Sequence, residues 1–248
     1  MKILLLDIET SPNTAYVWRL FKENIPLARL IESSNTLCWS AKWYGSKEMF
    51  FDSIHQSSRK GMLKGIHNLL DQSDAVVHFN GQAFDIPVLN REFLLNKMYP
   101  PAPYKQIDLL TVCRKQFSFV SNKLAHVTKE LGIEGKVNET DFTLWIRCMN
   151  NDPAAWKIME TYNKTDVVVL EKVYDRLLPW IKSHPNHGLY SGGGDVCVNC
   201  GSTHLQRRGF AYTAALKYQR FQCADCGNWM RSKKPIDLDK KAQYGNII

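Results

Sequence analysis

Residues 3–10 read Ile3-Leu4-Leu5-Leu6-Asp7-Ile8-Glu9-Thr10, a short apolar run that ends in acidic residues. This pattern predicts a buried strand over residues 2–7. Because side chains alternate along a strand, Asp7 and Glu9 point to the same face, where their charges repel each other. A divalent cation that takes hard oxygen ligands, Mg²⁺ or Mn²⁺, would relieve that repulsion. A solvated turn at a strand end is the alternative, and this motif alone leaves both open.

The following part of the chain carries further strand and helix signals. Strands are expected over residues 36–44, 47–52 and 75–79. Helices are expected over residues 60–71, from about Phe84, and over 107–117, 122–131, 141–149 and 153–178. Strands come first, then strands mixed with helices, then helices alone. This order predicts an α/β fold with a central mixed sheet flanked by helices.

The composition changes near residue 180. Residues 179–194 contain Pro185 and the run Ser191-Gly192-Gly193-Gly194, which is typical of a linker. We therefore expect a core domain over residues 1–180, a linker over 181–194, a compact cysteine-containing unit over 195–231 and a basic tail over 232–248.

Two more acidic residues are candidates for a site with the first strand. Asp85 ends the run Asn80-Gly81-Gln82-Ala83-Phe84-Asp85, in which Gly81 permits a tight turn. The turn would place Asp85 at the carboxyl edge of the sheet, where open sheets bind ligands, although a helix-capping aspartate is the alternative. Tyr162 lies four residues before Asp166, hence on the same face of a helix. A surface pair is the alternative there, but the apolar neighbours of Asp166 predict partial burial.

In order and in local sequence, these elements resemble the three motifs of the DEDD exonuclease superfamily, which has a ribonuclease H-like fold. Asp7-Ile8-Glu9-Thr10 resembles the first motif, Asn80-x-x-x-Phe84-Asp85 the second and Tyr162-x-x-x-Asp166 the third. The tyrosine in the third motif marks the tyrosine type, DEDDy. The resemblance covers roughly residues 1–180. Within the superfamily the chain is similar to stand-alone relatives of the family B DNA polymerase exonuclease domain.

The resemblance implies a 3′–5′ exonuclease that hydrolyses phosphodiester bonds with two Mg²⁺ or Mn²⁺ ions and releases nucleoside 5′-monophosphates. It implies that Asp7 bridges both ions and that Glu9 and Asp166 complete the site of the ion that activates water. Asp85 would hold the second ion. Tyr162 would orient the attacking water, because a phenol with a pKa of about 10 is a poor base at neutral pH.

Contacts to the substrate are expected from Thr10, Asn80, Phe84 and Lys123. Core packing is an equal alternative for Asn80 and Phe84, and a solvated surface position is the alternative for Lys123. DNA is the expected substrate, with RNA as the alternative, because phosphate chemistry does not distinguish the two sugars. Cleavage at branched or flapped ends is a further alternative. The protein partners that such an enzyme implies are replication or repair proteins.

A third alternative is a nucleic-acid-binding adaptor with an inactive nuclease fold. Such a protein would be expected to have lost one or more of the acidic positions. The sequence retains all four acids and the tyrosine, which argues against the adaptor.

The cysteines predict a second metal site. Cys197-x2-Cys200, then 22 residues, then Cys223-x2-Cys226 form two knuckles that can hold one ion. Four soft thiolates favour tetrahedral zinc, and because protein would occupy every position the ion is structural. A glycine after each pair allows the backbone to turn so that amides approach the sulfurs. Iron or unrelated free thiols are the alternatives. The unit resembles a zinc ribbon, whereas three more cysteines are isolated in apolar surroundings: Cys38, Cys113 and Cys148.

The net charge is +8, and +6 of it lies in residues 181–248, which hold ten lysines and arginines against four acids. Basic and aromatic residues interleave within the cysteine unit, which favours nucleic acid as its partner. Protein docking is the alternative, because some of these aromatic residues must form the core of so small a unit. No apolar run approaches the roughly 20 residues needed to cross a bilayer, and residues 3–6 are too short for a secretory signal. We therefore expect a cytoplasmic protein with no membrane partner.

Overall fold

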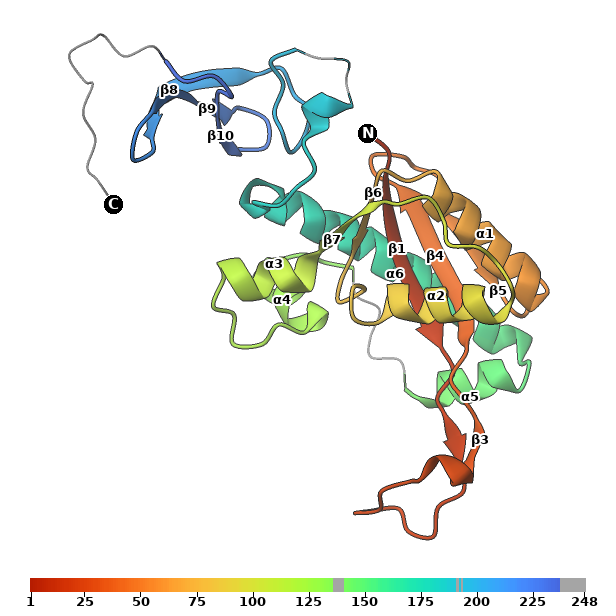
Figure 1. The fold of residues 1–248 in the computed structure, drawn as a ribbon. Helices are drawn as coiled ribbons and strands as arrows, with labels where there is room; N and C mark the ends of the chain where they lie inside the picture. The colour runs from red at the N-terminus through yellow and green to blue at the C-terminus, as the bar shows by residue number, and fades with distance from the viewer. Residues whose placement is uncertain (136–140, 191, 193, 237–248) are drawn as a thin grey trace. The chain divides into compact units, whose positions relative to one another are not determined.

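The computed structural model describes residues 1–135, 141–190, 192 and 194–236 (Figure 1). The chain divides into two compact units. One comprises residues 2–174, and the other starts at Asp175 and includes Met1. No helix in the described part of the chain is long and apolar enough to cross a membrane.

A five-stranded mixed sheet forms the centre of the first unit, as the sequence predicts. Its strands are β1 (Ile3–Thr10), β4 (Thr36–Trp43), β5 (Phe50–Ser53), β6 (Ala75–His78) and β7 (Lys105–Asp108). They lie in the order β5-β4-β1-β6-β7. β1 pairs antiparallel with β4 and parallel with β6, which in turn pairs parallel with β7. β4 and β5 are antiparallel.

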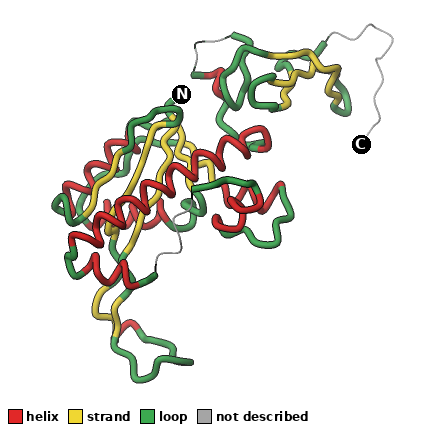
Figure 2. The backbone as a smooth tube through the Cα atoms, turned by 180° about the vertical axis from the view of Figure 1, so that it is seen from behind, coloured by secondary structure: helices red, strands yellow, loops and turns green. Residues whose placement is uncertain are grey.

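Helices flank the two faces of this sheet. The helices are α1 (Arg59–Asp71), α2 (Asp85–Leu95), α3 (Leu109–Gln116), α4 (Leu124–Glu130), α5 (Thr143–Met149) and α6 (Pro153–Leu177). Leu4, Leu6 and Ile8 of β1 share one core cluster with residues of α1 and α2. Because side chains alternate, Asp7 and Glu9 point to the opposite face. The long helix α6 crosses that face of the sheet (Figure 2).

Side-chain caps stand at the starts of α1 and α6. The Ser58 hydroxyl accepts the N–H of Gly61 at the start of α1. One Asp152 oxygen accepts the N–H of Ala154 at 2.9 Å, just before α6. Pro153 occupies the first position of α6, where its missing N–H and fixed φ cost nothing. The sequence therefore starts both helices with local hydrogen bonds.

The start of one predicted helix is wrong. Residues 107–117 were expected to be helical, but Ile107 and Asp108 end β7, and the helix starts at Leu109. The reason is tertiary, because Ile107 pairs with Val77 in a parallel ladder that local helical propensity does not anticipate. Asp108 caps α3 by accepting the N–H groups of Leu110 and Thr111, in keeping with a capping role.

An arm between the first two long strands is not anticipated by the sequence pattern. Ser11 and Asn35 close its base through the hydrogen bond from the Ser11 N–H to the Asn35 carbonyl, at 2.8 Å. Within it, β2 (Thr14–Ala15) pairs with β3 (Leu30–Glu32). The arm extends away from the five-stranded sheet (Figure 1). Trp18, Leu20 and Phe21 on it are each more than 80% exposed. Because these side chains are exposed rather than on a buried face, the sequence shows no periodic apolar pattern that would predict the arm.

The second unit contains a three-stranded antiparallel sheet. Its strands are β8 (Leu205–Tyr212), β9 (Lys217–Cys223) and β10 (Trp229–Arg231), in the order β10-β9-β8. The expected linker contains a short 3-10 helix at His187–Leu189, and the His187 N–H donates to the Val198 carbonyl at 2.8 Å. The start of the expected tail runs beside β9, because the Ile236 N–H donates to the Lys217 carbonyl at 2.8 Å. The rest of that tail, 237–248, lies outside the described residues.

Candidate active site and metal centres

Three carboxylates from two elements converge on the α6 side of the sheet. Asp7 and Glu9 come from alternate positions of β1, and Asp166 comes from α6. Ligand oxygens of the three residues all lie within 4.8 Å of one another. All three side chains are partly buried. A cluster of hard oxygen donors at this spacing can hold a divalent cation of the Mg²⁺ or Mn²⁺ type.

A buried asparagine fixes the orientation of Asp7. The Asn163 amide donates to Asp7 Oδ2 at 2.6 Å, and Asn163 is fully buried. It lies three residues before Asp166 on α6, so both side chains reach the same region. Sequence reasoning missed Asn163, although its position within the Tyr162-to-Asp166 turn was an available signal.

A tryptophan from α5 holds the second carboxylate. The Trp145 side chain donates a hydrogen bond to Glu9. Its ring also packs edge-to-face against Tyr162, with 5.9 Å between ring centroids. Tyr162 therefore lies beside the residue that contacts Glu9, on the same helix as Asp166. Nothing in the sequence around Trp145 marks it, because the contact depends on how α5 packs against the end of β1.

Asp85 lies next to the cluster but outside the group of three. It is buried at the first position of α2, and its Oδ1 accepts the N–H of Ile8 at 3.2 Å. The carboxylate is thus tied to the backbone between Asp7 and Glu9. Gly81 makes this turn possible, because a Cβ there would lie 2.4 Å from Cγ of His78. The predicted tight turn at Gly81 is therefore enforced by a close approach.

The four expected substrate contacts occupy different settings. Phe84 is 43% exposed directly before Asp85, so packing in the core is wrong for this residue. Asn80 is exposed in the turn with a φ of +70°, a conformation that asparagine tolerates. Thr10 is partly buried and pairs with Thr36, and Lys123 is exposed at the start of α4. Their contacts to a substrate stay predictions.

Burial and mutual repulsion disfavour the charged forms of these acids. Burial raises the pKa of Asp7 well above its ordinary value, and the charges of Glu9, Asp85 and Asp166 raise it further, against the hydrogen bond from Asn163. Burial, followed by the charge of Asp166, raises the pKa of Glu9 to about 8. Burial raises the pKa of Asp85 to about 7. A bound divalent cation would oppose each of these shifts, so the donor set fits such an ion.

These shifts predict how the metal-free protein responds to pH. Glu9 and Asp85 have folded-state pKa values near 8 and 7, above the values of about 4 in an unfolded chain. Between about pH 4 and pH 8 the folded state binds more protons, so the free energy of unfolding falls as pH rises. Without Mg²⁺, we expect the thermal midpoint of the first unit to fall by about 5 °C from pH 5.5 to pH 8.5.

Near-ultraviolet circular dichroism, recorded during heating at each pH, would measure this thermal midpoint. Addition of about 10 mM Mg²⁺ should restore the thermal midpoint at pH 8.5. It should change the midpoint little at pH 5.5, because protons already neutralise the acids there. A midpoint that rises from pH 5.5 to 8.5 in the absence of metal would contradict the clustered geometry.

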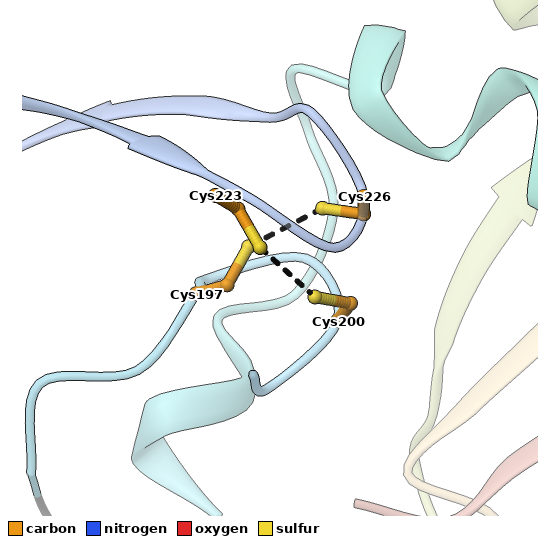
Figure 3. A group of neighbouring side chains, drawn as sticks. All are labelled: Cys197, Cys200, Cys223 and Cys226. Atoms are coloured by element: carbon orange, nitrogen blue, oxygen red, sulfur yellow. Dashed lines mark hydrogen bonds between the residues drawn. The ribbon is translucent and has the colours of Figure 1, made fainter. Parts of the chain in front are cut away.

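The four cysteines of the second unit converge as their spacing predicts (Figure 3). Sγ of Cys197 lies 3.5 Å from that of Cys226, and Sγ of Cys200 lies 3.6 Å from that of Cys223. These separations are too long for a disulfide, whose sulfurs are about 2.05 Å apart. They are close to the roughly 3.8 Å between sulfurs in a tetrahedron with zinc–sulfur bonds of about 2.3 Å. The cluster therefore fits structural zinc.

Backbone amides surround the sulfurs, as expected from the glycine that follows each pair. Gly201 and Gly227 both have positive φ, of +78° and +80°. Burial alone would raise the pKa of Cys223, but hydrogen bonds from the backbone of Cys226 and Asp225, together with those from the side chains of Cys200 and Cys226, outweigh it and lower the pKa to about 7. Burial outweighs the backbone hydrogen bond at Cys200 and raises the pKa of that thiol to about 11. Hydrogen-bond donors favour the thiolate, which is the form that binds metal.

Residues 35–178 match the family model RNase_H_2, described as the RNase_H superfamily. The match includes Asp85, Tyr162 and Asp166 and starts after β1. No match was found among curated proteins.

A solved structure with a similar fold is the family B DNA polymerase from the hyperthermophilic archaeon Pyrobaculum calidifontis. The TM-score is 0.50 at 16% sequence identity, and the alignment covers 72% of this chain and 24% of that chain. The chain thus spans about a quarter of the length of that polymerase, and at this identity the likeness shows the fold alone. Because the family match covers more than half of its residues, the chain belongs to the RNase H superfamily.

Proposed function

We propose that the chain is a divalent-metal-dependent 3′–5′ exonuclease that hydrolyses phosphodiester bonds of DNA and releases nucleoside 5′-monophosphates. The observation that carries the proposal is the convergence of Asp7, Glu9 and Asp166 within 4.8 Å, with Asp85 tied to the backbone between the first two. Membership of the RNase H superfamily is consistent with a nuclease. The likeness to a family B DNA polymerase adds support from the fold.

The residues of the site are held in place before a substrate arrives. Asn163 fixes Asp7, Trp145 fixes Glu9 and the Ile8 amide fixes Asp85. Two divalent ions, when bound, supply activation of the attacking water and neutralisation of charge at the phosphate. The protein contributes carboxylates whose orientation costs little further ordering during the reaction.

Tyr162 and Phe84 would act on the water and the terminal nucleotide. A phenol keeps its proton at neutral pH, so Tyr162 would orient the attacking water rather than deprotonate it. Phe84 is exposed next to Asp85, where its ring can pack against a terminal base or sugar. Thr10, Asn80 and Lys123 would hold the rest of the terminal segment, through hydrogen bonds and a phosphate contact.

Degradation of end-labelled substrates tests this proposal. With Mg²⁺ or Mn²⁺, a 5′-labelled single-stranded DNA should shorten progressively from its 3′ end, and the released product should be the 5′-mononucleotide. Parallel reactions on double-stranded DNA and on RNA identify the substrate. Exclusive degradation of RNA would select the alternative substrate, and internal cuts at flaps would select the endonuclease. Binding of all substrates without metal-dependent cleavage of any would overturn the proposal in favour of the adaptor.

A further inference from the structure

The register of the three-stranded sheet places two arginines opposite each other. Arg231 of β10 pairs with Arg220 of β9, and Trp229 of β10 pairs with Gln222. Partners across a ladder share a face, and alternation along β9 adds Tyr218 to that face. We call Arg220, Arg231, Tyr218 and Trp229 the arginine face.

Each of these arginines lies over an aromatic ring. The guanidinium carbon of Arg231 is 3.8 Å from the centroid of Tyr218, and that of Arg220 is 5.0 Å from the centroid of Trp229. The Arg220 Nε also donates to the Arg208 carbonyl at 2.8 Å. Stacking restricts a guanidinium and leaves its edge donors available, so less freedom is lost when it binds an anion.

Among the described residues, neither charge on this face has an acidic partner. Like charges directly opposite in a ladder are destabilising. Strands β8, β9 and β10 contain no acidic residue, and none of the described carboxylates lies within 4.0 Å of either guanidinium. Asp225 of the second knuckle instead pairs with His204 at 3.0 Å. Two stacked arginines that face each other, with no carboxylate beside them in the described part of the chain, are suited to binding an external anion.

We propose that the arginine face binds the phosphate backbone of nucleic acid. Arg220 and Arg231 contact neighbouring phosphates, and the half-exposed ring of Trp229 packs against a base or sugar. The choice of nucleic acid among polyanions rests on the proposed function of the first unit, whereas the anion site itself rests on the arginines. Two phosphate contacts from this face increase the affinity for nucleic acid but do not read the base sequence.

The opposite face of the same sheet provides a matched control. Arg207 pairs with Phe221, which alternates with Arg220 and therefore lies on the other side. Lys217 lies on that side too, and its Nζ is 3.9 Å from the centroid of the Phe210 ring. Replacing Arg207 and Lys217 removes the same charge from the same sheet as replacing Arg220 and Arg231.

Fluorescence anisotropy of a labelled single-stranded DNA tests the proposal. The full chain carries Asp7→Asn in every sample, so that the oligonucleotide stays intact. Relative to that background, Arg220→Gln with Arg231→Gln should weaken binding about tenfold at moderate salt. It should also reduce the slope of log affinity against log salt by about 1.4, which is the loss of two phosphate contacts on a single strand. Arg207→Gln with Lys217→Gln should change affinity by less than about threefold.

The outcomes separate the possible partners. Zinc content of one ion per chain in each variant shows that the ribbon is intact. Equal losses of DNA affinity in the two double variants would overturn the proposal. So would unchanged DNA affinity in the variant that carries Arg220→Gln and Arg231→Gln. So would loss of binding to polyglutamate with unchanged binding to DNA, which would indicate an acidic protein partner. DNA binding is measured here without cleavage. A failure to find nuclease activity would therefore contradict the proposed function of the first unit but not the proposed phosphate binding by the arginine face.

Discussion

The Asp7→Asn variant should lose cleavage and gain stability at the same time. Burial and then the charges of three neighbouring carboxylates raise the pKa of the partly buried Asp7, so its charge is costly in the metal-free protein. Asparagine has nearly the same shape, and its oxygen can still accept the hydrogen bond from Asn163. The substitution removes a ligand of both proposed ions, so kcat/KM should fall by about 10³-fold, or about 4 kcal/mol of transition-state stabilisation.

Two measurements on one protein sample check this pair of effects. Steady-state degradation of single-stranded DNA gives kcat/KM, and thermal unfolding at pH 8 without Mg²⁺ gives the stability. The midpoint should rise by several degrees over that of the unmodified chain. Glu48→Gln is a matched control, because Glu48 is exposed and the charge change is the same. It should leave both quantities unchanged.

A variant that keeps Mg²⁺-dependent cleavage would remove Asp7 from the proposed mechanism. A variant that is inactive but less stable would mean that the carboxylates do not repel one another in the folded chain. Raised stability with lost activity is the outcome that ties the acid cluster to function, since a residue kept only for folding would not be destabilising.

The Cys223→Ser variant should lose zinc and unfold the ribbon while the first unit stays folded. Binding of structural zinc is worth about 10–16 kcal/mol in small zinc-binding domains. In the described part of the ribbon, the only residues among the buried apolar set are Cys197, Tyr218 and Cys223. Without the ion, so small a core cannot offset the conformational entropy of the chain.

Zinc content and limited proteolysis follow this loss directly. The metal should fall from one ion per chain to none, and residues 195–231 should become sensitive to protease while a fragment containing residues 2–174 resists it. Cys113→Ser is the control, because Cys113 is a buried cysteine of α3 in the first unit. That variant should keep its zinc. Full retention of zinc in Cys223→Ser would exclude the four-cysteine site.

Much of both sites follows from local periodicity in the sequence. Alternation along β1 puts Asp7 and Glu9 on one face, and the helical repeat puts Tyr162 and Asp166 on one face of α6. The Cys-x2-Cys spacing with a following glycine specifies each knuckle without reference to the rest of the chain. Each of these features spans a few residues, so the regular backbone geometry of a strand, helix or turn is enough to predict it.

Only the tertiary structure decided which of these faces meet and what supports them. Asn163 reaches Asp7 across 156 positions of sequence, and the Ile8 amide reaches Asp85 across 77. Trp145 contacts Glu9 because α5 packs at the end of β1, and Ile107 joins the sheet because β6 offers a pairing edge. In the ribbon, the strand register sets Arg220 opposite Arg231. Each of these contacts depends on the packing and pairing of distant segments, which no local repeat in the sequence specifies.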